Sequence, residues 1–253
     1  MKSKGKATPE RRAKFSLSTR TSALILLAIT IILLIPFAGK AFNMDDPLFI
    51  WTAKHIQSHF ADPYGFSVNW YGKMAPMWKI TKNPPLASYY IALMAFVIGW
   101  SEPALHIAFL IPAIALVLGM YLLARLFCSR PLEAVLAAIL TPVFLISATT
   151  VMCDVMMLAF WVWAIYLWVR GLETSRHGLL APAMLFTALS ALTKYFGIAL
   201  IPLLAVYSIF RIRKPGLWAL HFLIPVAVLA GYQLATKSLY GQGLLSDAGQ
   251  YAT

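Results

Sequence analysis

Charged residues are scarce in this chain of 253 residues, where 12% are charged and 60% are hydrophobic. Soluble domains carry about 25% charged residues, so this composition excludes an ordinary soluble protein. Cysteine is scarcer still, and the two that occur, Cys128 and Cys153, exclude a disulfide framework. The sequence also lacks zinc-like Cys/His spacing, a glycine-rich phosphate loop and a GxSxG motif. With a mean hydropathy of +0.75, the chain is predicted to be an all-α integral membrane protein.

The net charge of +12 is related to membrane topology, because the basic residues lie between apolar runs and at the N-terminus, where they indicate which loops face the cytoplasm. The segment 1–21 is strongly basic and precedes the apolar run Leu24–Ala38. That run ends without a small-x-small cleavage site, so we predict a retained first membrane helix instead of a cleaved signal peptide. The tail 1–21 is then expected in the cytoplasm.

Six further apolar runs predict six further membrane helices, which makes about seven in all. They are Ala104–Phe127, Ala134–Val151, Val155–Val169, Leu179–Thr193, Phe196–Phe210 and Leu217–Ala235.

One more stretch, Leu86–Trp100, is ambiguous, and the distribution of Lys and Arg decides its placement. If it does not span, the cytoplasmic side holds 7 basic residues in the tail and 7 in later loops, 14 in all, against 7 outside. If it spans, the later seven move outside, against the positive-inside rule. We therefore expect it to lie along the outer face. The predicted layout is a transmembrane module over 22–236, with a long external loop at 39–103 that carries two interfacial helices. An external segment follows at 237–253, and we expect the natural protein to continue beyond it.

Asp45 and Asp46 stand side by side where the first membrane helix reaches water. A carboxylate facing lipid costs a few kcal/mol on the mildest insertion scale, so both are expected at the aqueous edge. One reading is structural, because Asp46 followed by Pro47 is a common helix start. The other is chemical, because two adjacent acids can supply a general base or a metal ligand.

Three further residues fall on the same predicted face. Lys82 precedes Asn83 and two prolines at the start of a helix, where it can hold an anion or simply be solvated while Asn83 caps. Asp154 begins the fourth membrane run and can cap it or join Asp45 or Asp46 around a divalent cation. Lys194 lies between two apolar runs and either snorkels or pairs with a phosphate. His55 and His59 are four residues apart without a third metal ligand.

These positions resemble the GT-C class of membrane glycosyltransferases, and most closely the bacterial family 39 group of protein O-mannosyltransferase-like and aminoarabinose-transferase-like enzymes. The matching elements are Asp45-Asp46, Asn83-Pro84-Pro85-Leu86, Asp154 and Leu192-Thr193-Lys194. The resemblance covers about residues 22–236. Members of that group continue for several more helices.

The resemblance implies an inverting enzyme that moves a sugar from a polyprenyl-phosphate donor to a hydroxyl of a lipid, glycan or protein. It implies Asp45 as the base and Lys82 and Lys194 as ligands of the donor phosphate. A divalent cation (Mg, Mn or Zn) held by Asp46 and Asp154 is a further expectation. The implied location is the bacterial inner membrane, with the N-terminus in the cytoplasm and the site on the outer face.

Two other classes remain open from sequence alone. A transporter or lipid flippase would use Lys194 and Asp154 along a substrate path, but such proteins often carry paired broken helices in two related halves. No such repeat occurs here, and the polar residues gather at one face. A membrane subunit without activity is the third reading. None of the three involves nucleic acid.

Overall fold

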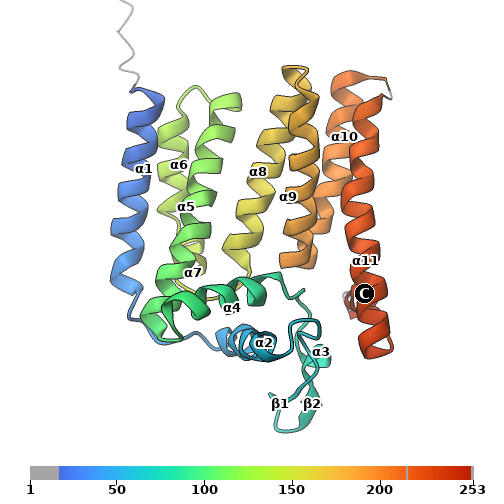
Figure 1. Cartoon of the computed structure of the whole chain (residues 1–253). Helices are drawn as coiled ribbons and strands as arrows, with labels where there is room; N and C mark the ends of the chain where they lie inside the picture. The colour runs from blue at the N-terminus through green and yellow to red at the C-terminus, as the bar shows by residue number, and fades with distance from the viewer. Residues whose placement is uncertain (1–16, 215, 252–253) are drawn as a thin grey trace, which may run out of the picture.

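The computed structural model describes residues 17–214 and 216–251. Most of the predicted cytoplasmic tail and the last two residues of the predicted external segment lie outside the described residues. The described residues form a helical bundle with a second layer of structure across one end (Figure 1).

The bundle contains every predicted membrane run. Its elements are α1 (Thr19–Leu34) with η1 (Ile35–Phe37), α5 (Glu102–Phe127), α6 (Pro131–Ile139), α7 (Pro142–Ala148), α8 (Asp154–Glu173), η2 (His177–Leu179) with α9 (Leu180–Thr193), η3 (Tyr195–Ala199) with α10 (Leu200–Ile212), and η4 (Leu217–Phe222) with α11 (Leu223–Tyr240). Within the described residues, five helices are long and apolar enough to cross a membrane, and the bent pair α6–α7 would be a sixth span. His177–Thr193 is a shorter apolar helix that stands among the others (Figure 1). The chain is therefore an all-α membrane protein.

One predicted helix, Ala134–Val151, is broken in the structure. It forms α6 and α7, whose axes differ by 66°. The break has a local cause, because Pro142 has no N–H to donate and forces the preceding residue out of helical geometry. Thr141 is extended (φ −71°, ψ 145°) and its hydroxyl accepts from the N–H of Phe144 as a new N-cap. The prediction of one continuous helix was wrong.

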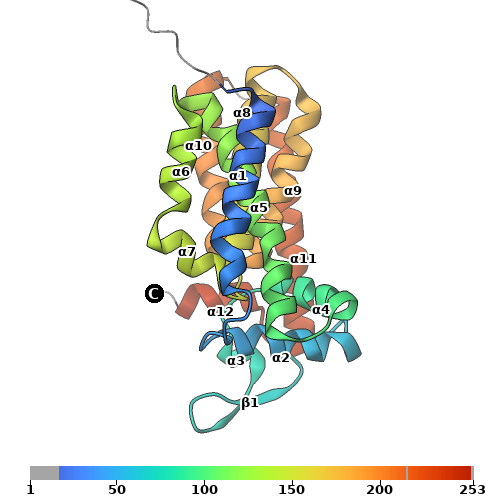
Figure 2. The same cartoon turned by 90° about the vertical axis from the view of Figure 1, so that its left-hand side faces the viewer.

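The layer across the end of the bundle, called the external layer because it lies outside the bundle, comprises α2 (Asp46–Ser58), the antiparallel hairpin β1 (Ser67–Asn69) and β2 (Met74–Pro76), α3 (Met77–Ile80) and α4 (Leu86–Ile98). Both α2 and α4 lie across the end of the bundle (Figures 1 and 2). The 13 residues of α4 would extend only about 20 Å, short of the roughly 30 Å hydrocarbon core. That this stretch does not span stays a prediction, and the position of α4 across the end of the bundle agrees with it.

The exposed face of α4 is apolar. Leu93, Phe96 and Val97 are 61, 84 and 68% exposed, whereas Ile91 on the other face is buried against α2 and α5. A helix that is apolar on its outer face suits the membrane boundary. The outer surface of this layer therefore carries an apolar strip over α4.

Small residues bring α8 and α9 together as an antiparallel pair. Ala164 of α8 and Ala183 of α9 are fully buried in one cluster, and Ser190 donates to the carbonyl of Met157 at 3.2 Å. In lipid the hydrophobic effect does not drive helices together, so they associate through close packing, and small side chains let the two backbones approach closely. Because the turn joining the two helices lies at the far end, the start of α8 meets the end of α9 beside the external layer.

The last turns of α11 pass the predicted module boundary at residue 236 and continue to Tyr240. There they meet the external layer, because Tyr64, Val68 and Met77 form one apolar cluster with Leu244 of α12 (Leu244–Tyr251). Figure 2 shows α12 at this same end of the bundle. Segments from both ends of the chain thus build the external layer.

Candidate functional site

Asp154 and Lys194 form an ion pair at the rim of the bundle. The Lys194 Nζ lies 2.6 Å from the Asp154 Oδ1, and both side chains are 35% exposed. Asp154 is the first residue of α8 and Lys194 follows the last residue of α9, so each charge opposes the partial charge of its helix end. Burial by itself would lower the pKa of Lys194, but the hydrogen bond and the charge of Asp154 outweigh it and raise that pKa. The amine therefore stays protonated at neutral pH.

A close backbone approach fixes the turn that carries Lys194. After α9, Lys194 is extended (φ −149°, ψ 133°), and its carbonyl accepts from the N–H of Gly197 at 2.8 Å. A Cβ on Gly197 would lie 2.4 Å from the carbonyl carbon of Ser190. Only glycine lets η3 pack this closely against α9, and that packing holds the lysine at the rim.

The two adjacent acids differ completely in environment. Asp46 is fully buried, whereas Asp45 is exposed. Asp46 accepts from the N–H of Asn43 at 2.7 Å and from the N–H of Val151, 105 residues away, at 3.1 Å. Burial raises the pKa of Asp46 above its usual value, and the two N–H donors and nearby positive charge only partly offset that effect.

The proposed capping roles of the acids are not what the structure shows. Asp45 is the N-cap residue of α2, but its side chain makes no capping bond, and Asp46 uses its oxygens elsewhere. Asp154 also makes no capping bond, since it begins α8 after the N-cap residue Cys153. Asn83 does not cap α4, whose N-cap residue is Pro85. Asp45 and Asp154 therefore do not act as side-chain caps, and Asp154 is paired with Lys194 instead.

Lys40 reinforces the connection made by Asp46. Its Nζ donates to the carbonyl of Thr149 at 3.0 Å, two residues before Val151. Together, Lys40 and Asp46 attach the loop that carries Asp45 to the turn that leads into Asp154. The sequence reading did not identify this attachment, because both contacts end on backbone groups that no side-chain motif marks.

Lys82 is also ion-paired. Its Nζ lies 2.5 Å from Asp247 in α12, with side chains 26% and 23% exposed. The segment is held by Tyr64, whose buried hydroxyl donates to the carbonyl of Asn83 at 2.7 Å. Asp247 was missed from sequence, although it is the one charged residue after Lys237.

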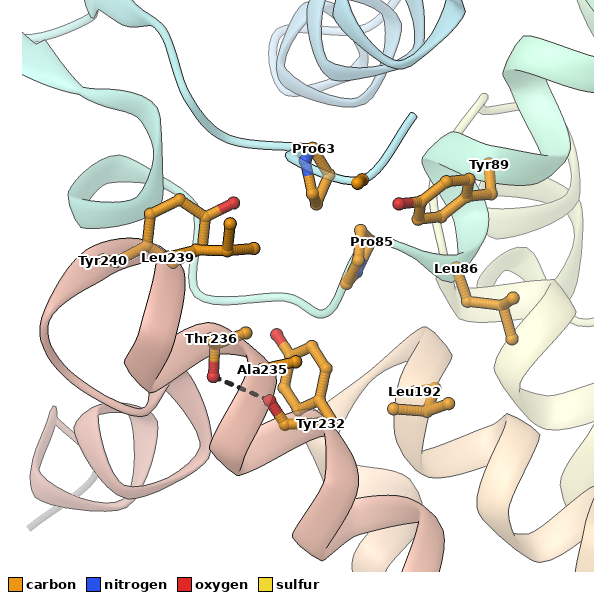
Figure 3. Close-up of a pocket in the computed structure, with 11 residues that line it drawn as sticks. Pro63, Pro85, Leu86, Tyr89, Leu192, Tyr232, Ala235, Thr236, Leu239 and Tyr240 are labelled. Atoms are coloured by element: carbon orange, nitrogen blue, oxygen red, sulfur yellow. Dashed lines mark hydrogen bonds between the residues drawn. The ribbon is translucent and has the colours of Figure 1, made fainter. Parts of the chain in front are cut away.

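A pocket of about 210 Å³ lies between the segments that carry the two lysines. Its wall includes Pro85, three residues after Lys82, and Leu192, two residues before Lys194. Figure 3 shows Tyr89 of α4 on one side and Tyr232 and Tyr240 of α11 on another. The pocket therefore forms where the external layer, α9 and α11 meet.

Contacts around the pocket connect the two ion pairs. The hydroxyls of Tyr195, next to Lys194, and Tyr232 are 3.0 Å apart. Gln233, next to Tyr232, accepts from the N–H of Leu245 at 3.1 Å, two residues before Asp247, the partner of Lys82. The segments that carry the two predicted phosphate-binding lysines thus both contribute to the wall of this pocket, through Pro85 and Leu192, while neither lysine is among the described residues that line it.

The cation predicted at Asp46 and Asp154 gains no support from geometry. Among the described residues, no group of three His, Cys, Asp or Glu side chains is placed to hold a metal. The oxygens of Asp46 accept backbone N–H groups, and Asp154 is paired with Lys194. His55 and His59 stack at 4.4 Å between ring centroids. The metal role stays a prediction.

A family model described as dolichyl-phosphate-mannose-protein mannosyltransferase matches residues 82–232, which is more than half of the chain. The matched range begins at Lys82 and contains Asp154 and Lys194, whereas Asp45 and Asp46 precede it. No match was found among curated proteins or among solved structures.

Proposed function

Because the chain belongs to the dolichyl-phosphate-mannose-protein mannosyltransferase family of GT-C membrane glycosyltransferases, we propose that it transfers a sugar from a polyprenyl-phosphate donor to a hydroxyl acceptor. The acceptor is a lipid, a glycan or a protein. The proposed place is the outer face of a bacterial inner membrane, with the N-terminus in the cytoplasm. The external layer and the rim of the bundle beneath it would form the site.

The observation that carries the proposal is the gathering of three kinds of group at one end of the bundle. An exposed carboxylate, Asp45, two lysines held by ion pairs, Lys82 and Lys194, and an apolar pocket all lie there. A base, cations for a leaving phosphate and an apolar surface are what transfer from a lipid phosphate requires.

Asp45 would act as the general base. In this step it takes the proton of the acceptor hydroxyl while that oxygen bonds to the anomeric carbon. The bond from the anomeric carbon to the phosphate oxygen breaks, and the electron pair leaves with the phosphate. One displacement inverts the anomeric configuration. The exposure of Asp45 supports this role, because the acceptor must approach it from water.

The lysines would neutralise the leaving phosphate. Lys194 pairs with Asp154 while both side chains are 35% exposed, and ion pairs of that exposure are worth about 0–1 kcal/mol. A substrate phosphate can therefore take over one N–H donor of Lys194 at little cost. A divalent cation, should one bind, would draw on Asp46 or Asp154 together with oxygens of the substrate, and would stabilise the same negative charge.

Replacement of Asp45 tests the proposal. Loss of a general base should lower the rate of transfer about 10²–10⁴-fold, and Asp45→Asn should fold and bind donor normally because the side chain is exposed. The measurement is sugar transfer from a short-chain polyprenyl-phosphate donor by the purified full chain. Glu133→Gln makes the same charge change at an exposed site on α6 and is the control. Transfer by Asp45→Asn at the rate of Glu133→Gln would refute the catalytic role.

A further inference from the structure

We infer that an open pocket at the base of the β1–β2 hairpin binds a neutral sugar ring of the acceptor, so that the acceptor is a glycan. This inference rests on the proposed function and chooses among the three acceptor classes named there. The pocket, which we call the hairpin pocket, has a volume of about 340 Å³, and small-molecule sites measure roughly 300–1,000 Å³. Figure 1 shows the hairpin and the end of α11 at the same end of the molecule. The described residues that line the pocket include Asp62, Gly65, Phe66, Ser67, Trp78 and Tyr240.

The carboxylate of Asp62 is held in place at this pocket. Its Oδ1 accepts from the hydroxyl of Tyr240 at 2.7 Å, and that hydroxyl in turn accepts from the N–H of Tyr64 at 3.1 Å. Among the described residues, no hydrogen bond reaches the other oxygen, Oδ2. A Cβ on Gly65 would overlap Oδ2, so glycine at this position leaves room for the oxygen. A fixed carboxylate oxygen with unused acceptor capacity suits a ligand that donates hydrogen bonds, such as a hydroxyl.

Aromatic rings supply much of the remaining wall. Trp78 stacks on Tyr240 with 6.0 Å between the ring centroids. Phe66 packs on the ring of His55 at 4.8 Å, and both Phe66 and Trp78 are half-buried. These rings offer apolar surface beside a carboxylate. A sugar matches both features, because its ring has an apolar C–H face and a rim of hydroxyls.

The charges around the hairpin pocket disfavour the other ligands that a lipid-phosphate transferase meets. Asp62 is the one charged residue among the described residues that line the pocket, so it would repel a phosphate. A hydrocarbon chain would cover the carboxylate without giving it a partner, which is costly. A cation is disfavoured by Lys79, whose Nζ lies 5.1 Å from the ring centroid of Trp78. A neutral ligand with several hydroxyls remains, and the exposed hydroxyl of Ser67 can donate to it or accept from it.

A sugar also fits better than an extended peptide. A peptide that binds beside a hairpin normally adds as a further strand through backbone hydrogen bonds. At the pocket, β2 ends in Pro76, which pairs with Ser67 and has no N–H to donate. Strand addition is therefore weakened at the place where the pocket opens.

The hairpin pocket lies next to the groups proposed for transfer. Leu239 and Tyr240, at the end of α11, line both this pocket and the apolar pocket between the two lysine segments, and Figure 3 shows both residues in the apolar pocket. Leu48, three residues after Asp45, belongs to the same apolar cluster as Trp78 and Tyr240. The acceptor sugar would thus be bound beside the lysine segments and close to the first turn of α2.

Saturation-transfer NMR tests the assignment directly. The full chain in nanodiscs, purified without sugar-based detergents, is mixed with the methyl glycosides of glucose, galactose, mannose and N-acetylglucosamine. Irradiation of the aromatic protons of the protein should transfer saturation to the ring protons of at least one of these sugars, because the sugar ring lies against Phe66 and Trp78. If none of the sugars receives saturation, the inference is wrong.

Substitutions at the mouth of the pocket give the second arm. Ser67→Trp should abolish the sugar signal, because the new indole fills the pocket. Asn69→Trp is the matched control, since Asn69 is exposed on the same face of β1 and is not among the described residues that line the pocket. Asp62→Asn should lower the sugar affinity about tenfold, as expected when a charge-assisted hydrogen bond becomes a neutral one.

Melting temperature and elution volume check that the three variants fold. A folded Ser67→Trp that keeps the signal of Asn69→Trp would mean that the sugar binds elsewhere, and this result would overturn the inference. Unchanged sugar affinity in Asp62→Asn would contradict it as well.

Donor turnover distinguishes a failure of this inference from a failure of the proposed function. It is measured as release of polyprenyl phosphate from a short-chain donor by the wild type and by Asp45→Asn. If turnover depends on Asp45 while no sugar binds, the inference is wrong and the proposed transfer stands. The same holds if a serine-containing peptide binds in place of a sugar and Ser67→Trp blocks it. If sugars bind in the hairpin pocket and no donor is consumed, the pocket is a sugar site and the proposed function is wrong.

Discussion

The membrane bundle and the external layer are held together in different ways. In the bundle, helices that follow one another in the chain pack through small and apolar side chains, as α8 and α9 do. The external layer also packs on apolar clusters, but single polar contacts across the sequence are added to them: Asp46 with Val151, 105 residues apart, and Lys82 with Asp247, 165 apart. Apolar packing spreads its free energy over many atoms, whereas each polar contact here places one candidate functional group. A substitution that removes one of these polar contacts should therefore affect only the candidate functional group that the contact holds in place.

The largest expected difference between the two ends of the bundle is in chemical access. Cys128 is exposed and follows the last residue of α5, a helix end that lies opposite the external layer in Figure 1, whereas Cys153 is buried. An impermeant maleimide added to intact cells should leave the wild type unlabelled and should label a Cys128→Ser, Tyr71→Cys variant, because Tyr71 is 77% exposed at the hairpin. Mass spectrometry of the purified protein reads the result. Labelling of Cys128 from outside would invert the proposed orientation.

The next effect concerns the two ion-paired lysines, Lys82 and Lys194. Lys194→Met or Lys82→Met should raise the donor concentration required for half-maximal transfer about 10- to 150-fold, as expected for a lost charged hydrogen bond of about 1.5–3 kcal/mol. Expression should not change. Lys79→Met is the control, since Lys79 is exposed in the same layer and lies over the ring of Trp78. Should all three variants need the same donor concentration, the phosphate is held elsewhere.

Substitutions of the two adjacent acids should have different effects: Asp46→Asn should lower the stability of the fold, and Asp45→Asn should lower the rate of transfer. In Asp46→Asn, the amide group has one acceptor oxygen in place of two, so one of the N–H donors of Asn43 and Val151 loses its partner. A buried donor left unpaired costs about 1–3 kcal/mol. The melting temperature should fall, while that of Asp45→Asn stays at the wild-type value. Equal melting temperatures for the two variants would contradict the role of Asp46 in attaching the external layer to the bundle.

The smallest effect is a pH dependence of α2. Burial, and next the charge of His59, lower the pKa of His55 below 6.5, and Asp62 only partly opposes this. As pH falls below 6.5, the unfolded chain takes up a proton that the native His55 resists, so stability decreases. His55→Phe should remove that part of the decrease in melting temperature between pH 7.5 and pH 5.5, while keeping a ring against His59 and Phe66. Identical pH profiles would show that His55 does not titrate in this way.

The sequence by itself was enough for the membrane class, the helical runs and the placement of Leu86–Ile98 across the bundle end, because hydrophobicity and basic charge act locally along the chain. It was also enough to bring Asp154 and Lys194 to one face, since a helix and its antiparallel successor must return to the starting side. Pro142 indicates a helix break in the sequence, but the prediction of a helix over Ala134–Val151 did not take it into account.

Only the tertiary structure distinguished Asp46 from Asp45 and paired Lys82 with Asp247. Adjacent acids look alike in a sequence, and which one is buried depends on backbone N–H groups contributed by distant segments such as Val151. The pocket could not be predicted from the sequence either. Its walls come from α4, α9 and α11, and no sequence pattern within one helix indicates a cavity between several packed helices. The physical reason is the same in each case: these features are made by contacts between residues whose separation along the chain leaves no local pattern.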